Sequence, residues 1–181
     1  DGGGLIMARR LDRILVFDPG SGLITCEAGV LLDEILQRVV AAGWFLPVTP
    51  GTCFVTVGGA LANDVHGKNH HRAGTFGRHV RAFELVRSDG TTLNCSRDDN
   101  PSLFSATIGG MGLTGLIRRV TLQLLRIDTP DMMQEAIHFD GLDRFFALAA
   151  ESDASHDYTV AWIDALASGR GFGRGVFFRA N

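Results

Sequence analysis

The sequence predicts an α+β fold built from antiparallel strands and short helices. Apolar and polar residues alternate in several short stretches that are joined by turn residues, which is typical of strands. Between two of them lies a stretch with the spacing of a helix. A new series of strand and helix patterns begins after Asp128-Thr129-Pro130. We therefore expect one α+β domain over residues 1–127 and the beginning of a second α+β domain over residues 128–181.

The first domain is expected to begin with a hairpin and a helix. Residues 11–17 and 22–28 predict two strands around the turn Asp18-Pro19-Gly20-Ser21-Gly22. Residues 31–42 predict a helix, since their apolar positions recur at the intervals i, i+3, i+4, i+7 and i+8. Gly43 is a suitable end for this helix, because glycine readily adopts the left-handed conformation that follows a last turn.

Three further elements complete the prediction for the first domain. Residues 80–95 predict a second hairpin that turns at Ser88-Asp89-Gly90. Asn100-Pro101 predicts the start of a short helix, with asparagine as the cap and proline in the first turn. Residues 116–125 alternate and predict a strand.

The second domain is expected to contain one helix and three strands. A strand over residues 134–139 precedes a helix over 141–151, and strands over 157–164 and 174–180 follow. The last predicted strand has no obvious partner in the sequence.

Composition limits the classes of function. The 181 residues are 45% hydrophobic and carry a net charge of −3, without a basic patch, so we expect no nucleic-acid partner. No apolar run approaches the roughly 20 residues of a membrane span, and Asp1-Gly2-Gly3-Gly4 is no signal peptide. The three cysteines form no disulfide pattern. A cytoplasmic location is the default expectation, although an absent N-terminal segment could hide an export signal.

Residues 50–71 carry the most informative motif. Four glycines in this run, Gly51, Gly58, Gly59 and Gly67, are expected to leave backbone N–H groups open to a ligand. Threonine, histidine, lysine and asparagine side chains add hydrogen-bond donors and a cation. The run suits a large, flat, anionic ligand such as a dinucleotide. Because glycine disfavours helix, we expect residues 51–69 to be an extended segment that lines the ligand, and not a long helix.

The same run resembles a known family. It is similar to the flavin-binding core of the PCMH-type, or vanillyl-alcohol-oxidase, FAD oxidoreductases, and within that family to the decaprenylphosphoryl-β-D-ribose 2-oxidase branch. The stretches that carry the resemblance are PGTCFVTVGGALANDVHGKNHH (50–71), GLITCEAGV (22–30), GTFGRHVRAFELVRSDG (74–90), LFSATIGGMGLTGLI (103–117) and, more loosely, YTVAWIDA (158–165). The resemblance implies a PCMH-type FAD-binding domain that lacks its first pyrophosphate loop, followed by the start of a substrate domain.

The resemblance also implies the site residues. The expected cofactor-binding residues are Gly51, Thr52, Thr56, Val57, Gly58, Gly59, His66, Gly67, Lys68, Asn69 and Ile117. Lys68 is the expected catalytic residue, since a cation beside the flavin can stabilise the reduced ring or orient the substrate. The alternative is that Lys68 is an ordinary solvated surface lysine.

Two other interpretations of the polar and glycine motifs are less well supported. Residues 110–115 fit the pattern G-x-G-x-x-G, but a nicotinamide site needs a strand before the glycines and a helix after them, and the order here is reversed. We expect a glycine turn that leads into a strand near the FAD. His66, His70 and His71 could suggest a metal site with Asp64, but no fourth ligand has a familiar spacing, so we expect no metal.

The implied function is oxidation of a sugar hydroxyl to a ketone with non-covalent FAD. The resemblance points to the 2-hydroxyl of a polyprenyl-phosphate-linked ribose, a step towards cell-wall arabinan. One alternative is an aldonolactone or sugar-alcohol oxidase, and another is a truncated fragment without flavin binding or activity. The expected partners are a small-molecule or lipid-linked sugar, an unknown electron acceptor and a possible second copy of the chain.

Overall fold

The structure is a computed structural model that describes residues 6–181, apart from the side chain of Arg170. The prediction that Asp1-Gly2-Gly3-Gly4 is no signal peptide therefore concerns residues outside the described range. The chain forms two compact units. The first contains the residues up to Gly67 together with Thr75–Asp128, and the second contains Lys68–Gly74 together with Thr129–Asn181. The second unit thus includes a short internal segment that the division at residues 127 and 128 does not anticipate.

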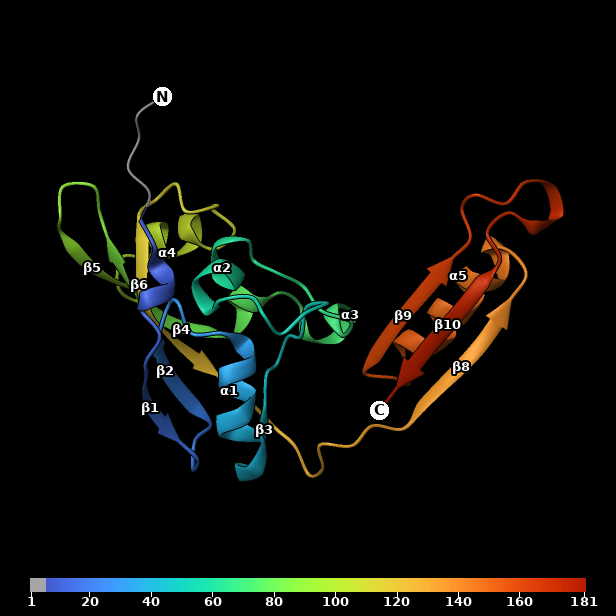
Figure 1. The fold of residues 1–181 in the computed structure, drawn as a ribbon, viewed down its shortest axis with the longest axis horizontal. Helices are drawn as coiled ribbons and strands as arrows, with labels where there is room; N and C mark the ends of the chain where they lie inside the picture. Colours follow the sequence, from blue (N-terminus) through green and yellow to red (C-terminus); the bar gives the residue numbers. More distant parts are fainter. Residues whose placement is uncertain (1–5) are drawn as a thin grey trace. The chain divides into compact units, whose positions relative to one another are not determined.

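The first unit is built on a five-stranded antiparallel sheet with the strand order β1-β2-β6-β4-β5 (Figure 1). Its strands are β1 (Ile14–Asp18), β2 (Leu23–Glu27), β4 (Val80–Val86), β5 (Thr92–Ser96) and β6 (Leu116–Gln123). Every neighbouring pair in this sheet is antiparallel. Both predicted hairpins are confirmed, and the α+β class is correct.

One face of this sheet supplies the core of the first unit. Ile24 on β2, Phe83 on β4 and Val120 on β6 are at most 3% exposed. Helix α1 (Leu32–Val39) contributes Ile35 and Val39, both fully buried. Burying side chains of this size stabilises the fold by about 1.5–3 kcal/mol each. The periodic pattern of residues 31–42 therefore predicts the helix correctly.

The end of this helix also agrees with the sequence. A short 3-10 turn (Val40–Ala42) follows α1, and Gly43 has a φ of 77°, in the left-handed region. The chain then enters the two-residue strand β3 (Trp44–Phe45), which pairs with β7 (Leu125–Arg126). The strand predicted over residues 116–125 is therefore divided between β6 and β7, because the chain leaves the large sheet after Gln123 to pair with β3.

Two local predictions in the first unit are correct only in part. Residues 51–69 contain no long helix, but they are not wholly extended, because Val57–Ala62 forms the short helix α2. Asn100 occupies the N-cap position of helix α4 (Pro101–Thr107) and Pro101 lies in its first turn, as predicted, but the Asn100 side chain makes no cap hydrogen bond. The amide Nδ2 of Asn100 instead donates to the carbonyl oxygen of Asn94, at 2.7 Å, and so holds the start of α4 against β5.

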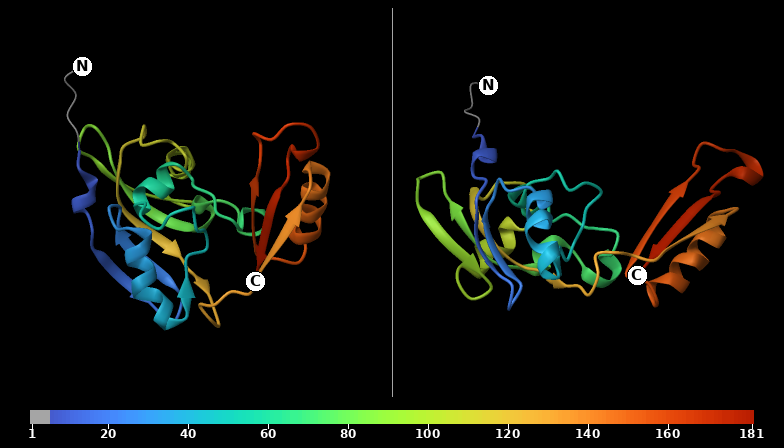
Figure 2. Two further views of the ribbon diagram at one scale, coloured as in Figure 1. Left: turned by 45° about the vertical axis from the view of Figure 1, so that its right-hand side comes forward. Right: turned by 60° about the horizontal axis from the view of Figure 1, so that its bottom comes forward.

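The second unit is a three-stranded antiparallel sheet covered by one helix. Its strands, β8 (Gln134–Phe139), β9 (Tyr158–Ile163) and β10 (Gly175–Ala180), have the order β8-β10-β9. Helix α5 (Leu142–Asp153) lies along one face of the sheet (Figure 2), where Leu148 packs with Phe139 and Phe177. The last strand is the central one and pairs on both sides, so the expectation that it lacks a partner is wrong.

The predicted elements of the second unit are all present within one or two residues of their expected bounds. Besides α2, the short helices that were not predicted are α3 (His70–Ala73) and the 3-10 helices Ala8–Arg10, Phe76–His79 and Gly169–Gly171. Within residues 6–181, no helix combines the length and apolar character needed to cross a membrane.

An ion pair between the exposed Arg13 side chain and the buried carboxylate of Glu27 gives a prediction for acid stability. Glu27 is 4% exposed, and its carboxylate accepts hydrogen bonds from the backbone N–H and the guanidinium of Arg13, at 2.8–3.2 Å. The side-chain hydrogen bond from Arg13 lowers the pKa of Glu27 from 4.5 to about 2. A lowered pKa stabilises the fold above the unfolded value, and this contribution is lost as the pH falls from 4.5 towards 2.

We therefore expect Glu27→Gln to lower the melting temperature at pH 7 and to have a smaller effect as the pH falls below 4.5. The measurement is thermal unfolding of both proteins between pH 7 and pH 3. A difference between the two proteins that stays constant over this range would show that the ionised carboxylate is not what stabilises the fold.

Candidate cofactor site

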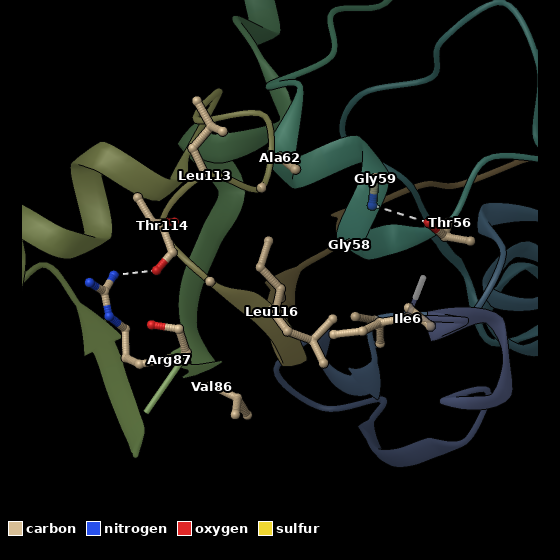
Figure 3. Close-up of a pocket in the computed structure, with 16 residues that line it drawn as sticks. Ile6, Thr56, Gly58, Gly59, Ala62, Val86, Arg87, Leu113, Thr114 and Leu116 are labelled. Carbon is tan, nitrogen blue, oxygen red and sulfur yellow. Dashed lines mark hydrogen bonds between the residues drawn. The ribbon is translucent and has the colours of Figure 1, made fainter. Parts of the chain in front are cut away.

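The first unit contains a cleft of about 700 Å³ (Figure 3), within the usual range for ligand pockets. Helix α2, the β4–β5 hairpin and the glycine turn before β6 all contribute to its walls. The lining residues are mostly apolar or small: Ile6, Ala8, Ala28, Thr56, Gly58, Gly59, Ala62, Val86, Arg87, Ser88, Gly112, Leu113, Thr114, Gly115, Leu116 and Ile117. Such walls suit a ligand with a flat, largely apolar body and a few polar groups.

The first turn of helix α2 forms one wall of the cleft. Thr56 caps this helix, and its Oγ1 accepts a hydrogen bond from the backbone N–H of Gly59 at 3.1 Å. The N–H of Gly58 donates to the carbonyl oxygen of Ala28 at 2.8 Å. These two amides are therefore already used within the protein. The expectation that Gly58 and Gly59 present bare N–H groups to the ligand is wrong, because Ala28 accepts the hydrogen bond of the first amide and the Thr56 side chain accepts that of the second.

Gly58 instead allows two chain segments to approach closely. A Cβ atom at this position would lie 2.8 Å from the Cβ of Ala28 and 3.0 Å from its carbonyl oxygen. Contacts this short are repulsive, so any larger residue must displace α2 from the end of β2. Glycine at this position keeps α2 against the sheet and holds the wall of the cleft in place.

The glycine turn forms the opposite wall. Residues 110–115 lead directly into β6, and no helix follows them, as predicted. The backbone N–H of Met111 donates to the carbonyl oxygen of Ala62, at 2.8 Å, and so ties the turn to the end of α2. Leu113, at the tip, is 90% exposed although it lines the cleft. A bound ligand would remove part of this apolar side chain from water, which favours binding.

The structure divides the predicted cofactor residues into those that line the cleft and those that do not. Thr56, Gly58, Gly59 and Ile117 line the cleft. Gly51 and Thr52 are exposed, and Val57 is fully buried in the core, so these three are not among its lining residues. His66 pairs with Thr75 through an isolated antiparallel bridge, and the adjacent Gly67 is buried; neither residue is among those that line the cleft.

Lys68 and Asn69 belong to the second unit. The carbonyl oxygen of Lys68 accepts a hydrogen bond from the backbone N–H of Thr159 on β9 at 2.9 Å, and its side chain is exposed. Asn69 is 5% exposed, and its carbonyl oxygen accepts the N–H groups of Arg72 and Ala73. The backbone of Lys68 is therefore held by the second unit.

Two side chains strengthen this attachment. His71 Nε2 lies 3.0 Å from the carbonyl oxygen of His156, and Arg72 donates to the carbonyl oxygen of Ala154 at 2.8 Å. Arg72 also forms an ion pair with Asp157 at 3.1 Å. Both partners of this ion pair are at least 42% exposed, so we attribute to it only a modest stabilisation.

We expect Arg72→Ala to loosen the segment that carries Lys68. Loss of the Arg72 contacts should speed hydrogen exchange at the amide of Thr159 roughly three- to tenfold, as expected for contacts worth about 1 kcal/mol. The measurement is native-state hydrogen exchange resolved by residue. A matched control is Arg174→Ala, which removes the ion pair with Asp164 in the same unit and should leave the Thr159 amide unchanged.

Several lining residues were not predicted from the sequence. Arg87 and Ser88 belong to the β4–β5 hairpin, and Ala28 follows β2. These positions lie in the stretches 22–30 and 74–90, which carry the family resemblance. That resemblance was the one signal in the sequence that could have marked them as part of the site. Within residues 6–181, no group of three or more histidine, cysteine, aspartate or glutamate side chains could hold a metal ion.

The fold and the cleft define the class of this protein. Residues 1–96, more than half of the chain, match the family described as FAD binding domain, and the chain belongs to this family. Its cofactor is FAD. The cleft fits that cofactor, because a nucleotide has a flat body that suits apolar walls, and the glycines keep side chains out of the cleft.

Individual relatives extend the comparison. The chain is 39% identical, over its whole length, to decaprenylphosphoryl-beta-D-ribose oxidase from Mycolicibacterium smegmatis, of which it covers 40%. It is 32% identical over 78% of its length to L-gulonolactone oxidase from Mus musculus, of which it covers 33%. It is also 29% identical over 68% of its length to D-lactate dehydrogenase from Anaerostipes hadrus, of which it covers 27%. The chain thus spans at most two fifths of these relatives.

Proposed function

We propose that the protein is an FAD-dependent oxidoreductase that oxidises a sugar hydroxyl to a ketone, and that its substrate is a polyprenyl-phosphate-linked ribose oxidised at the 2-hydroxyl. One observation carries the proposal of substrate. The 39% identity to a decaprenylphosphoryl-ribose oxidase extends over all of the chain, whereas the similarity to L-gulonolactone oxidase covers 78% of it. The similarity to the first relative thus extends over the second unit as well as the first.

In this proposal, the residues of the chain bind the cofactor and orient it. When bound, FAD supplies the two-electron acceptor that takes hydride from the carbinol carbon. Helix α2 and the glycine turn would hold the cofactor between largely apolar walls. We propose that Thr56, Gly58, Gly59 and Ile117 contact it there, and that the attachment is non-covalent. Gly51, Thr52 and Val57 are retained only as weaker candidates, because none of them lines the cleft.

Lys68 is the proposed catalytic residue. Its side chain is exposed, so the ammonium group can reach a ligand. Its backbone is held by the hydrogen bond from the N–H of Thr159. A cation there could orient the substrate hydroxyl or phosphate and stabilise negative charge that develops as the hydride leaves. We propose that His66, Gly67 and Asn69, the sequence neighbours of Lys68, also lie along the cofactor.

A second candidate function is oxidation of an aldonolactone. The similarity to L-gulonolactone oxidase favours this candidate over other sugar oxidations. The two candidates differ in the phosphate of the substrate, which a lactone lacks and which a lysine can bind. They can therefore be separated by direct comparison of substrates.

The experiment is anaerobic reduction of the purified yellow protein, followed at the flavin absorbance. The expected result is rapid bleaching with a polyprenylphosphoryl ribose, formation of the 2-keto product, and little bleaching with L-gulono-1,4-lactone. Rapid bleaching with the lactone alone would establish the second candidate instead. A colourless protein that does not take up added FAD would contradict both candidates and favour a protein without flavin activity.

A further inference from the structure

Arg87 is the one charged side chain among the described residues that line the cleft. It is half-buried, and the other lining residues are apolar, small or uncharged. Within residues 6–181, no carboxylate lies within ion-pair distance of it. The carboxylate of Asp89, on the same hairpin, interacts with it only through the longer-range Coulomb attraction. A cation on apolar walls favours an anionic group of a ligand, because the interaction is stronger where water is partly excluded.

The guanidinium of Arg87 is held in place by the glycine turn. Its Nη1 donates to the carbonyl oxygen of Thr114 (Figure 3). The hydroxyl of Thr114 lies 2.9 Å from that of the fully buried Thr107, which in turn donates to the carbonyl oxygen of Leu103 at 2.8 Å. This series of contacts connects Arg87 to helix α4. A guanidinium has five N–H donors, so the bond to Thr114 leaves others for a ligand.

Arg87 offers N–H donors to a ligand, whereas two backbone amides in the wall of the cleft are already hydrogen-bonded within the protein. The N–H groups of Gly58 and Gly59, at the start of α2, already have partners in Ala28 and Thr56. An anionic group in the cleft therefore cannot rely on these two amides. Among the described lining residues, Arg87 is the side chain that brings both a positive charge and several N–H donors.

We propose that Arg87 is a cofactor-binding residue that receives a phosphate group of FAD. This assignment rests on FAD as the ligand of the cleft and is independent of which sugar is oxidised. The diphosphate of FAD is the anionic part of the cofactor, and arginine binds phosphate oxygens through two parallel N–H groups. Arg87 thus selects a phosphorylated nucleotide over an uncharged nucleoside.

The experiment compares two ligands on the apoprotein, ADP and adenosine, by calorimetry. Arg87→Met retains the length of the side chain and removes its charge and donors. We expect it to weaken ADP binding at least tenfold, to change adenosine binding less than twofold, and to reduce the salt dependence of ADP affinity. Arg87→Lys should restore part of the ADP affinity, because it retains the charge but not the paired geometry.

The matched control is Arg97→Met. Arg97 lies in the same unit, outside this cleft, and also donates to a backbone carbonyl, that of Val80 at 3.1 Å. It should leave the ratio of ADP to adenosine affinity unchanged. Equal weakening of ADP and adenosine by Arg87→Met would show that Arg87 only holds the glycine turn, and would overturn the proposal. Unchanged binding of both ligands would overturn it as well.

If Arg87→Met does not fold, Arg87→Gln decides the question, because its amide can still donate to the carbonyl oxygen of Thr114 but carries no charge. A glutamine variant that binds ADP and adenosine in the wild-type ratio at low and high salt would leave no role for the cation and would overturn the assignment. Failure of the proposed oxidation would appear separately, as a flavin that stays oxidised with every sugar substrate although the nucleotide binds normally.

Discussion

Replacement of Gly58 by valine is expected to remove most FAD from the purified protein. The Cβ of any residue at this position would lie 2.8 Å from the Cβ of Ala28, and the branched valine adds two methyl groups. Overpacking of this kind costs about 1–3 kcal/mol, since the backbone must move. Here the movement displaces α2, which forms a wall of the cleft and carries the Thr56 cap. We expect FAD affinity to fall about ten- to hundredfold.

The measurement is the ratio of flavin to protein after purification, together with titration of the apoprotein with FAD. Gly58→Ala should have an intermediate effect, because it adds the clashing Cβ without the branches. Gly141→Ala is the matched control, since a Cβ at that position meets no atom within 4 Å. Wild-type FAD content in Gly58→Val would mean that α2 is not part of the cofactor site.

Gly58 also illustrates why sequence reasoning missed α2. Two adjacent glycines disfavour helix by about 1 kcal/mol each, so a local prediction favours an extended segment. The tertiary contact with Ala28 outweighs this local cost, because it requires glycine and gives the Gly58 amide a partner. The same contact explains why the amide is not available to a ligand. A single sequence contains no signal for an approach between segments so far apart.

The regular elements were predictable where local patterns decide them. The hairpin that turns at Ser88-Asp89-Gly90 follows from its turn residues, and Gly43 ends its helix as expected. The place of β10 at the centre of its sheet was not predictable, since strand order depends on which distant strands pair. Alternation of residues predicts a strand but does not identify its neighbours.

The candidate site shows the same limit. Arg87 lines the cleft because β4 pairs with β6, which places Val86 opposite Leu116 and brings the hairpin beside the glycine turn. In the sequence, Arg87 is one of 17 lysine and arginine residues and has no distinguishing neighbour. Lys68 follows Gly67 directly in the sequence, yet the two residues belong to different units, because the Thr159 amide binds the Lys68 carbonyl oxygen.

We expect Lys68→Ala to slow flavin reduction by the sugar substrate about a hundredfold, as is typical when one donor to a developing charge is lost. The ratio of flavin to protein should stay near its wild-type value, because an interaction that strengthens only during hydride transfer contributes little to resting cofactor binding. The Lys68 backbone should remain in place, since its contact with Thr159 involves only main-chain atoms. The measurements are stopped-flow reduction and flavin content.

Two companion variants make the result specific to Lys68. Lys68→Arg should recover part of the reduction rate, because it retains the positive charge. His66→Ala should have the converse effect and mainly lower flavin content, since an imidazole beside the cofactor would bind it in its resting state. The bridge between His66 and Thr75 is formed by the backbone and is expected to survive this change. A Lys68→Ala protein that is reduced at the wild-type rate would identify Lys68 as a solvated surface lysine without a part in the chemistry.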